Sequence, residues 1–119
     1  MSRDERLYLD DMLETLQKIL EYGQDLDFPT FATHRMAYDA ILRNLEILGE
    51  AAKNVSPDIR DRYPDVGWRK IAGLRDILAH SYFGLMDETL WDIVTHKVPA
   101  LLPCLEAILR GTERSNRVD

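Results

Sequence analysis

The chain has 119 residues, of which 45% are hydrophobic and 30% are charged, so it can bury one hydrophobic core but is too short for two ordinary domains. Its formal net charge of −6, from 15 basic and 21 acidic residues, argues against non-specific nucleic-acid binding through counterion release. No apolar stretch approaches the roughly 20 residues that cross a bilayer, and the N-terminus has no secretory signal pattern, so we expect a cytoplasmic protein without a membrane span. The single cysteine, Cys104, excludes an internal disulfide and a cysteine-based zinc cluster, and we expect it to be a small buried residue.

The first half of the chain predicts two long amphipathic helices. The first spans about residues 3–22, because apolar residues repeat at helical spacing as far as Gly23; they are Leu9, Met12, Leu13, Leu16, Ile19 and Leu20. Residues 25–30, DLDFPT, predict a connecting loop, since Pro29 and the flanking acids disfavour helix. The second helix is expected over residues 31–55, where apolar positions again step by three or four: Ala37, Ile41, Leu45, Leu48, Ala52 and Val55.

The second half predicts two further helices. The pair Ser56-Pro57 has the pattern of a helix N-cap followed by proline in the first turn, and it opens a short turn before a third helix over residues 67–80. A fourth helix is expected over residues 88–109, where Pro99 and Pro103 must kink or restart it.

These elements predict the fold class. No segment has the pattern of a strand, and four helices that each have one apolar face describe an all-α protein, an antiparallel four- to five-helix bundle. We expect one helical domain over residues 1–110 and a polar, flexible tail over residues 111–119.

Several common site classes have no support in the sequence. None of the three histidines follows a glutamate at the spacing of a di-iron bundle, and the glycines are too dispersed for a phosphate-binding loop. Glu46 and Glu50 are one helical turn apart with basic residues at positions 43 and 53, which favours a solvated ladder of ion pairs over an acid/base pair. We expect His34 and His96 at the surface or at helix ends, and we expect no metal and no cofactor.

The segment RDILAHSY, from Arg75 to Tyr82, carries an R-x4-H-x-Y pattern in the predicted third helix. On an ideal helix Arg75 and His80 are about 140° apart, whereas Asp76 and His80 are four residues apart and can touch. A carboxylate beside an imidazole fixes its tautomer and favours its protonated form, as a general acid/base needs. An arginine is a permanent cation suited to a phosphate or its developing charge.

Arginine and histidine suffice for metal-free RNA cleavage, because the RNA 2′-OH is itself the nucleophile and the protein need only move protons and stabilise a pentacoordinate phosphoryl group. For Arg75 and His80 to meet one phosphate, either the helix ends before His80 or a second copy of the chain supplies the other half in a two-fold dimer. From the residues alone a structural alternative stays open: a surface ion pair of Arg75 and Asp76, with His80 at a helix end and Tyr82 packed at a loop.

Beyond the motif itself, four segments that together span nearly the whole chain are informative: DMLETLQKILEY, AILRNLEILGEAAKNVSP, YPDVGWRKIAGLRDILAHSYFG and LWDIVTHKVPALLPCLEAIL. With them the chain resembles the HEPN superfamily (higher eukaryotes and prokaryotes nucleotide-binding), specifically its HepT-like toxin branch. The resemblance implies a homodimeric α-helical bundle. It also implies a metal-independent endoribonuclease that acts as the toxin of a bacterial or archaeal toxin–antitoxin pair.

The resemblance also implies roles for the motif residues. Arg75 and His80 match the catalytic pair, Asp76 occupies the polar site that would orient His80, and Tyr82 matches a tyrosine that a minimal nucleotidyltransferase antitoxin modifies with AMP. The expected partners are RNA, this antitoxin and a second copy of the chain, with larger assemblies left open. The alternative is a non-catalytic helical adaptor that binds a nucleotidyltransferase and is modified by it. Residues 1–28, with three basic and eight acidic residues, favour this alternative.

Overall fold

The computed structural model describes residues 3–79 and 87–116, and within these ranges every regular element is a helix. Three long helices dominate: α1 (Arg3–Gly23), α3 (Arg35–Lys53) and α8 (Val98–Asn116). The prediction of an all-α fold is therefore confirmed.

The core forms where α1 packs against α3 and α8. The fully buried side chains of α1 are Leu9, Met12, Leu16 and Ile19. Leu13 and Leu20, which belong to the same predicted stripe, are only partly buried because they lie at its edge. Four of the predicted positions of α3 are in the core, Ile41, Leu45, Leu48 and Ala52. Ala37 is only partly buried, and Ala51, outside the predicted stripe, is buried. Burial of each large aliphatic side chain contributes about 1.5–3 kcal/mol, which gives the bundle its main stabilisation.

The predicted loop over residues 25–30 is wrong in its second half, where a short helix, α2 (Phe28–Thr33), begins. Asp27 caps it by accepting a hydrogen bond from the Thr30 amide at 2.9 Å. Hydrogen bonding from the Thr30 side chain, and then from its amide, lowers the pKa of Asp27. Pro29 lies in the first turn, where the N–H groups have no acceptor within the helix, so the lack of an N–H in proline costs no hydrogen bond. The helix expected over residues 31–55 is therefore divided: α2 ends at Thr33, and α3 starts after the N-cap residue His34.

The predicted third helix is also divided. Ser56 caps α4 (Pro57–Arg62) as expected, and a 3-10 turn, Pro64–Val66, follows. The chain then forms α5 (Trp68–Ala72) and α6 (Leu74–Ala79), separated at Gly73.

The predicted fourth helix consists of α7 (Asp87–Asp92), a π-helical turn, Ile93–Lys97, and α8. The wide turn ends two residues before Pro99, whose nitrogen cannot donate a helical hydrogen bond, so the expected restart is confirmed near Pro99. It is not found at Pro103, which lies inside α8. α8 then continues through Pro103 to Asn116, beyond the predicted end at residue 109 and into the segment expected to be a tail.

Cys104 is exposed, so the prediction of a buried cysteine is wrong. The buried side of α8 is formed by Val98, Leu105, Ile108 and Leu109, and Cys104 lies outside it.

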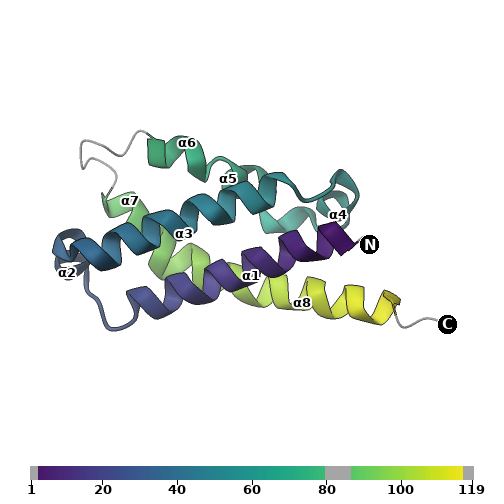
Figure 1. Cartoon of the computed structure of the whole chain (residues 1–119), viewed down its shortest axis with the longest axis horizontal. Helices are drawn as coiled ribbons and strands as arrows, with labels where there is room; N and C mark the ends of the chain where they lie inside the picture. Colours follow the sequence, from purple (N-terminus) through teal and green to yellow (C-terminus); the bar gives the residue numbers. More distant parts are fainter. Residues whose placement is uncertain (1–2, 80–86, 117–119) are drawn as a thin grey trace.

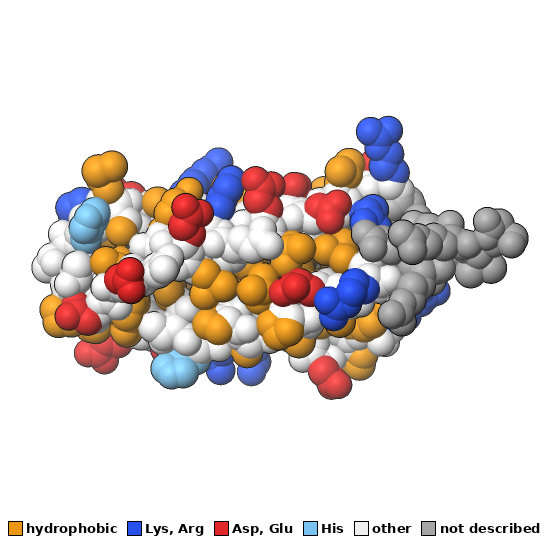
Figure 2. All heavy atoms as spheres, turned by 90° about the horizontal axis from the view of Figure 1, so that it is seen from below, with side chains coloured by type: hydrophobic (Ala, Val, Ile, Leu, Met, Phe, Trp, Pro, Cys, Tyr) orange, Lys and Arg blue, Asp and Glu red, His pale blue; other side chains and the backbone are white. Residues whose placement is uncertain are grey.

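Figure 1 shows that α1, α3, the α5–α6 segment and the α7–α8 segment alternate in direction, which makes the bundle antiparallel. Its lower side, turned toward the viewer in Figure 2, carries hydrophobic side chains between dispersed acidic and basic ones. Among the described residues no helix is both long enough and apolar enough to cross a membrane.

Candidate active site

The structure places two of the four predicted site residues. Arg75 and Asp76 lie in the first turn of α6, directly after Leu74, whose buried side chain packs this helix on α3. Both charged side chains are exposed. His80 and Tyr82 lie outside the described residues, so the contact between Asp76 and His80 and the convergence of Arg75 and His80 stay predictions.

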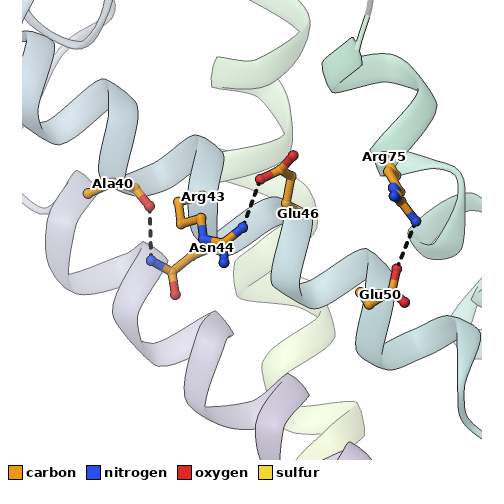
Figure 3. A network of polar contacts seen from close by, with 6 residues as sticks. All are labelled: Ala40, Arg43, Asn44, Glu46, Glu50 and Arg75. Atoms are coloured by element: carbon orange, nitrogen blue, oxygen red, sulfur yellow. Dashed lines mark hydrogen bonds and ion pairs between the residues drawn. The ribbon is translucent and has the colours of Figure 1, made fainter.

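Arg75 forms an ion pair with Glu50 of α3. Arg75 Nη1 donates to Glu50 Oε2 at 3.1 Å, and the two side chains are 64% and 53% exposed (Figure 3). An ion pair with this much solvent contact contributes about 0–1 kcal/mol to folding, so its main effect is on where the guanidinium lies. The partners are 25 residues apart in the sequence and come from different helices.

The predicted ladder on α3 is confirmed only in part. Arg43 pairs with Glu46 at 3.2 Å, as expected for residues three apart on a helix. Glu50 instead contacts Arg75, because α6 lies against this end of α3. Helical spacing reports only partners on the same helix, so it could not find this contact.

Both ion pairs line an open cleft of about 370 Å³. Tyr8 and Asp11 of α1 form one side of the cleft and Arg75 of α6 the other. The α3 residues between them are Arg43, Glu46, Ile47, Glu50, Ala51 and Asn54. Figure 3 shows the Arg75 side chain extending from α6 toward Glu50.

Gly49 allows the α5–α6 segment to come close to α3. A Cβ at this position would lie 3.1 Å from the carbonyl oxygen of Ile71 and 3.6 Å from the Cβ of Leu74. A residue without a side chain permits this approach without displacing either backbone, whereas a Cβ at 3.1 Å would require a shift of a few tenths of an ångström. Since Glu50 follows Gly49 and Arg75 follows Leu74, the close contact places the two charged residues side by side. In the sequence, the only indication of this close contact was a glycine inside an otherwise amphipathic helical pattern.

The cleft is mixed in charge, with two arginines against three carboxylates: Arg43 and Arg75, Asp11, Glu46 and Glu50. Such a cleft does not attract a polyanion along its whole length. Arg75 can still bind a phosphate, because a guanidinium has five N–H donors in a planar fork and the contact with Glu50 is made through Nη1.

A second polar contact lies just beyond the undescribed residues 80–86. Tyr38 of α3 donates a hydrogen bond to Asp87, the first residue of α7, with an oxygen–oxygen distance of 2.5 Å. Burial and this hydrogen bond raise the pKa of Tyr38 to about 12. The Tyr38 ring lies 5.1 Å from the ring of Phe31, which in turn lies 5.0 Å from Trp91. These contacts hold the start of α7 against α2 and α3, and sequence patterns gave no sign of them.

The two other histidines lie at the surface, as predicted. His34 Nδ1 accepts a hydrogen bond from the Ala37 amide and so caps α3. His96, in the π-helical turn, lies 3.0 Å from the carboxylate of Asp92. Across residues 3–79 and 87–116 no group of three or more His, Cys, Asp or Glu side chains is arranged to hold a metal ion.

Known proteins resemble this chain over most of its length. It is 40% identical over 111 residues to the Methanocaldococcus jannaschii protein named "Putative RNase MJ0127", which covers 93% of this chain and 92% of the relative. A second protein of that organism, "Putative RNase MJ1380", is 38% identical over 89% of this chain and 97% of its own. "Probable ribonuclease HepT" of Thermococcus cleftensis is 37% identical over 85% of this chain and 92% of its own.

No solved structure is significantly similar to the chain. The family model described as Ribonuclease HepT-like matches residues 12–108, which include the whole R-x4-H-x-Y motif. Together with relatives at least 37% identical over nearly their full length, this match shows that the chain belongs to the Ribonuclease HepT-like family.

Proposed function

We propose that the chain is a metal-independent endoribonuclease, the toxin of a HEPN-type toxin–antitoxin pair that acts in the cytoplasm. Family membership and the names of the relatives support RNA as the substrate. The structural observation that carries the proposal is Arg75, an exposed guanidinium held by Glu50 at the edge of an open cleft. A permanent cation in this position can bind a phosphodiester.

The reaction needs no group from outside the protein and the RNA. A base removes the proton of the ribose 2′-OH, the 2′-oxygen attacks the adjacent phosphorus, and the 5′-oxygen leaves with a proton. The products are a 2′,3′-cyclic phosphate and a 5′-hydroxyl end. In this proposal His80 transfers protons, Asp76 orients His80, and Arg75 stabilises the negative charge of the pentacoordinate phosphorus.

The proposed site is composed at a two-fold dimer interface. An isologous interface brings the same patch of both subunits together, so two copies of Arg75 and two of His80 would share one cleft. This arrangement overcomes the angle of about 140° that separates the two residues on an ideal helix.

The proposed antitoxin is a minimal nucleotidyltransferase that transfers AMP from ATP to the Tyr82 hydroxyl and releases pyrophosphate. The phosphodiester formed beside His80 would fill the cleft and repel the phosphate of an incoming RNA. Intact mass after incubation with the nucleotidyltransferase and ATP should increase by whole AMP units. Tyr82→Phe should show no increase, and equal labelling of this variant would refute the assignment.

The test of the nuclease is cleavage of total cellular RNA by the purified chain in the presence of EDTA. We expect the wild-type chain to produce 2′,3′-cyclic phosphate ends, and we expect Arg75→Ala and His80→Ala to produce none. If RNA stays intact with the wild-type chain, or is cut equally by the variants, the proposal fails.

The alternative is a non-catalytic adaptor that binds a nucleotidyltransferase. The excess of carboxylates over arginines in the cleft favours it. In that case Arg75→Ala and His80→Ala would leave RNA processing unchanged and alter only complex formation, which size-exclusion chromatography with the partner would detect.

A further inference from the structure

We propose that Glu50 is a positioning residue for RNA cleavage, because it holds the Arg75 guanidinium at the edge of the cleft in the orientation that receives a phosphate. This inference rests on the proposed function. It adds a residue outside the R-x4-H-x-Y motif, on a different helix, to the machinery of the site.

The geometry of the backbone supports this role. Gly49 allows α3 to approach the carbonyl of Ile71 closely, and Glu50 therefore reaches Arg75 from a firmly packed helix. Leu48 and Ala51, the neighbours of this pair on α3, are buried in the core. The packed backbone fixes where the Glu50 side chain starts, and the ion pair gives the long, exposed Arg75 side chain one preferred direction. A guanidinium that is already oriented loses less conformational freedom when it binds a phosphate.

A carboxylate beside Arg75 could also act in the opposite sense, by competing with the phosphate. The exposure of the pair decides between the two effects. Because both side chains are more than half exposed, water screens their attraction, and the pair is weak enough to share its guanidinium with a phosphate. The planar fork can also serve both acceptors at once, since Nη1 contacts Glu50 and Nε and Nη2 carry further donors. We therefore assign Glu50 to positioning and not to inhibition.

Glu46 provides a matched control. It lies one helical turn before Glu50 on α3, lines the same cleft, and pairs with an arginine at nearly the same distance, 3.2 Å against 3.1 Å. Its partner is Arg43, which does not belong to the motif. Glu46→Gln and Glu50→Gln thus remove the same charge from the same cleft, and only Glu50→Gln loosens Arg75.

The kinetic experiment compares cleavage of a short single-stranded RNA by the full-length wild type, Glu50→Gln and Glu46→Gln. Removing a negative charge should lower KM for RNA slightly in Glu46→Gln. In Glu50→Gln the loss of Arg75 orientation should offset this gain. Glu50→Gln should also lower kcat by about fivefold, whereas Glu46→Gln should keep the wild-type kcat. Glu50→Asp, which keeps the charge, should recover part of kcat. Equal kcat values in the two Gln variants, or a raised kcat in Glu50→Gln, would overturn the inference.

A second measurement does not depend on cleavage. The Nε–Hε signal of Arg75 in an arginine-labelled NMR spectrum, assigned with Arg75→Lys, should show slow rotation of the guanidinium in the wild type and in Glu46→Gln. In Glu50→Gln the rotation should be faster. An unchanged Arg75 signal in Glu50→Gln would refute the positioning role. If no variant cleaves RNA, the proposed function fails, and this comparison still decides whether Glu50 holds Arg75.

Discussion

Replacing Gly49 with alanine tests the contact that places Arg75 beside Glu50. Gly49 is buried within α3, where alanine would normally stabilise the helix by about 1 kcal/mol. Here the new Cβ would lie 3.1 Å from the carbonyl oxygen of Ile71. This oxygen belongs to the backbone of α5 and cannot rotate away as the end of a side chain could. The whole α5–α6 segment would have to move by a few tenths of an ångström.

The magnitude follows from two opposing effects. Forcing extra atoms into a packed interior costs about 1–3 kcal/mol, which exceeds the gain in helix propensity of about 1 kcal/mol. A cost of about 2 kcal/mol, in the middle of this range, less the gain of about 1 kcal/mol, means that the free energy of unfolding of Gly49→Ala should fall by about 1 kcal/mol. For a domain of this size, 1 kcal/mol corresponds to roughly 4 °C in Tm.

Urea unfolding followed by circular dichroism at 222 nm measures this change. Gly111→Ala in α8 is the control, because the nearest atom to its Cβ would be the Tyr63 hydroxyl oxygen at 3.3 Å, the movable end of a side chain. We expect this variant to be as stable as the wild type or slightly more stable. A Gly49→Ala protein as stable as the wild type would show that the close approach of α3 and α5 does not explain this glycine.

Two further predictions concern the stability of the bundle. Leu45→Ala, at a fully buried position of α3, should lower the free energy of unfolding by about 2–5 kcal/mol, measured in urea; a loss below 1 kcal/mol would mean that the site is not part of the packed core. Tyr38→Phe removes the hydrogen bond to Asp87 and should cost about 1 kcal/mol at neutral pH. Because the pKa of Tyr38 is raised to about 12 from about 10 in the unfolded chain, its contribution is complete below pH 10 and is lost as pH rises toward 12. Between pH 8 and 11.5 the free energy of unfolding should therefore decrease more steeply with pH for the wild type than for Tyr38→Phe. An equal pH dependence in the two proteins would contradict the assigned pKa.

Local sequence patterns predicted the helices well where the spacing of apolar residues was the only deciding factor. The apolar spacing of α1 and α3 identified Leu9, Leu16, Leu45 and Leu48 as core residues, because the period of a helix is a local property of the chain. The same reasoning failed at Pro29. A proline disfavours the interior of a helix but is well tolerated in its first turn, and only the cap formed by Asp27 decides which of the two applies.

The candidate site was likewise predicted from the sequence only in part. The sequence by itself determined the all-α class, the main core positions and the motif that contains Arg75, since these depend on residue type and on spacing along one helix. Only the tertiary structure decided that Arg75 contacts Glu50 and lines a cleft with Tyr8, because these residues come from three different helices. The close packing at Gly49 brings Glu50 and Arg75 together. Contacts between distant segments depend on how closely two backbones approach each other, and helical periodicity carries no information about that distance.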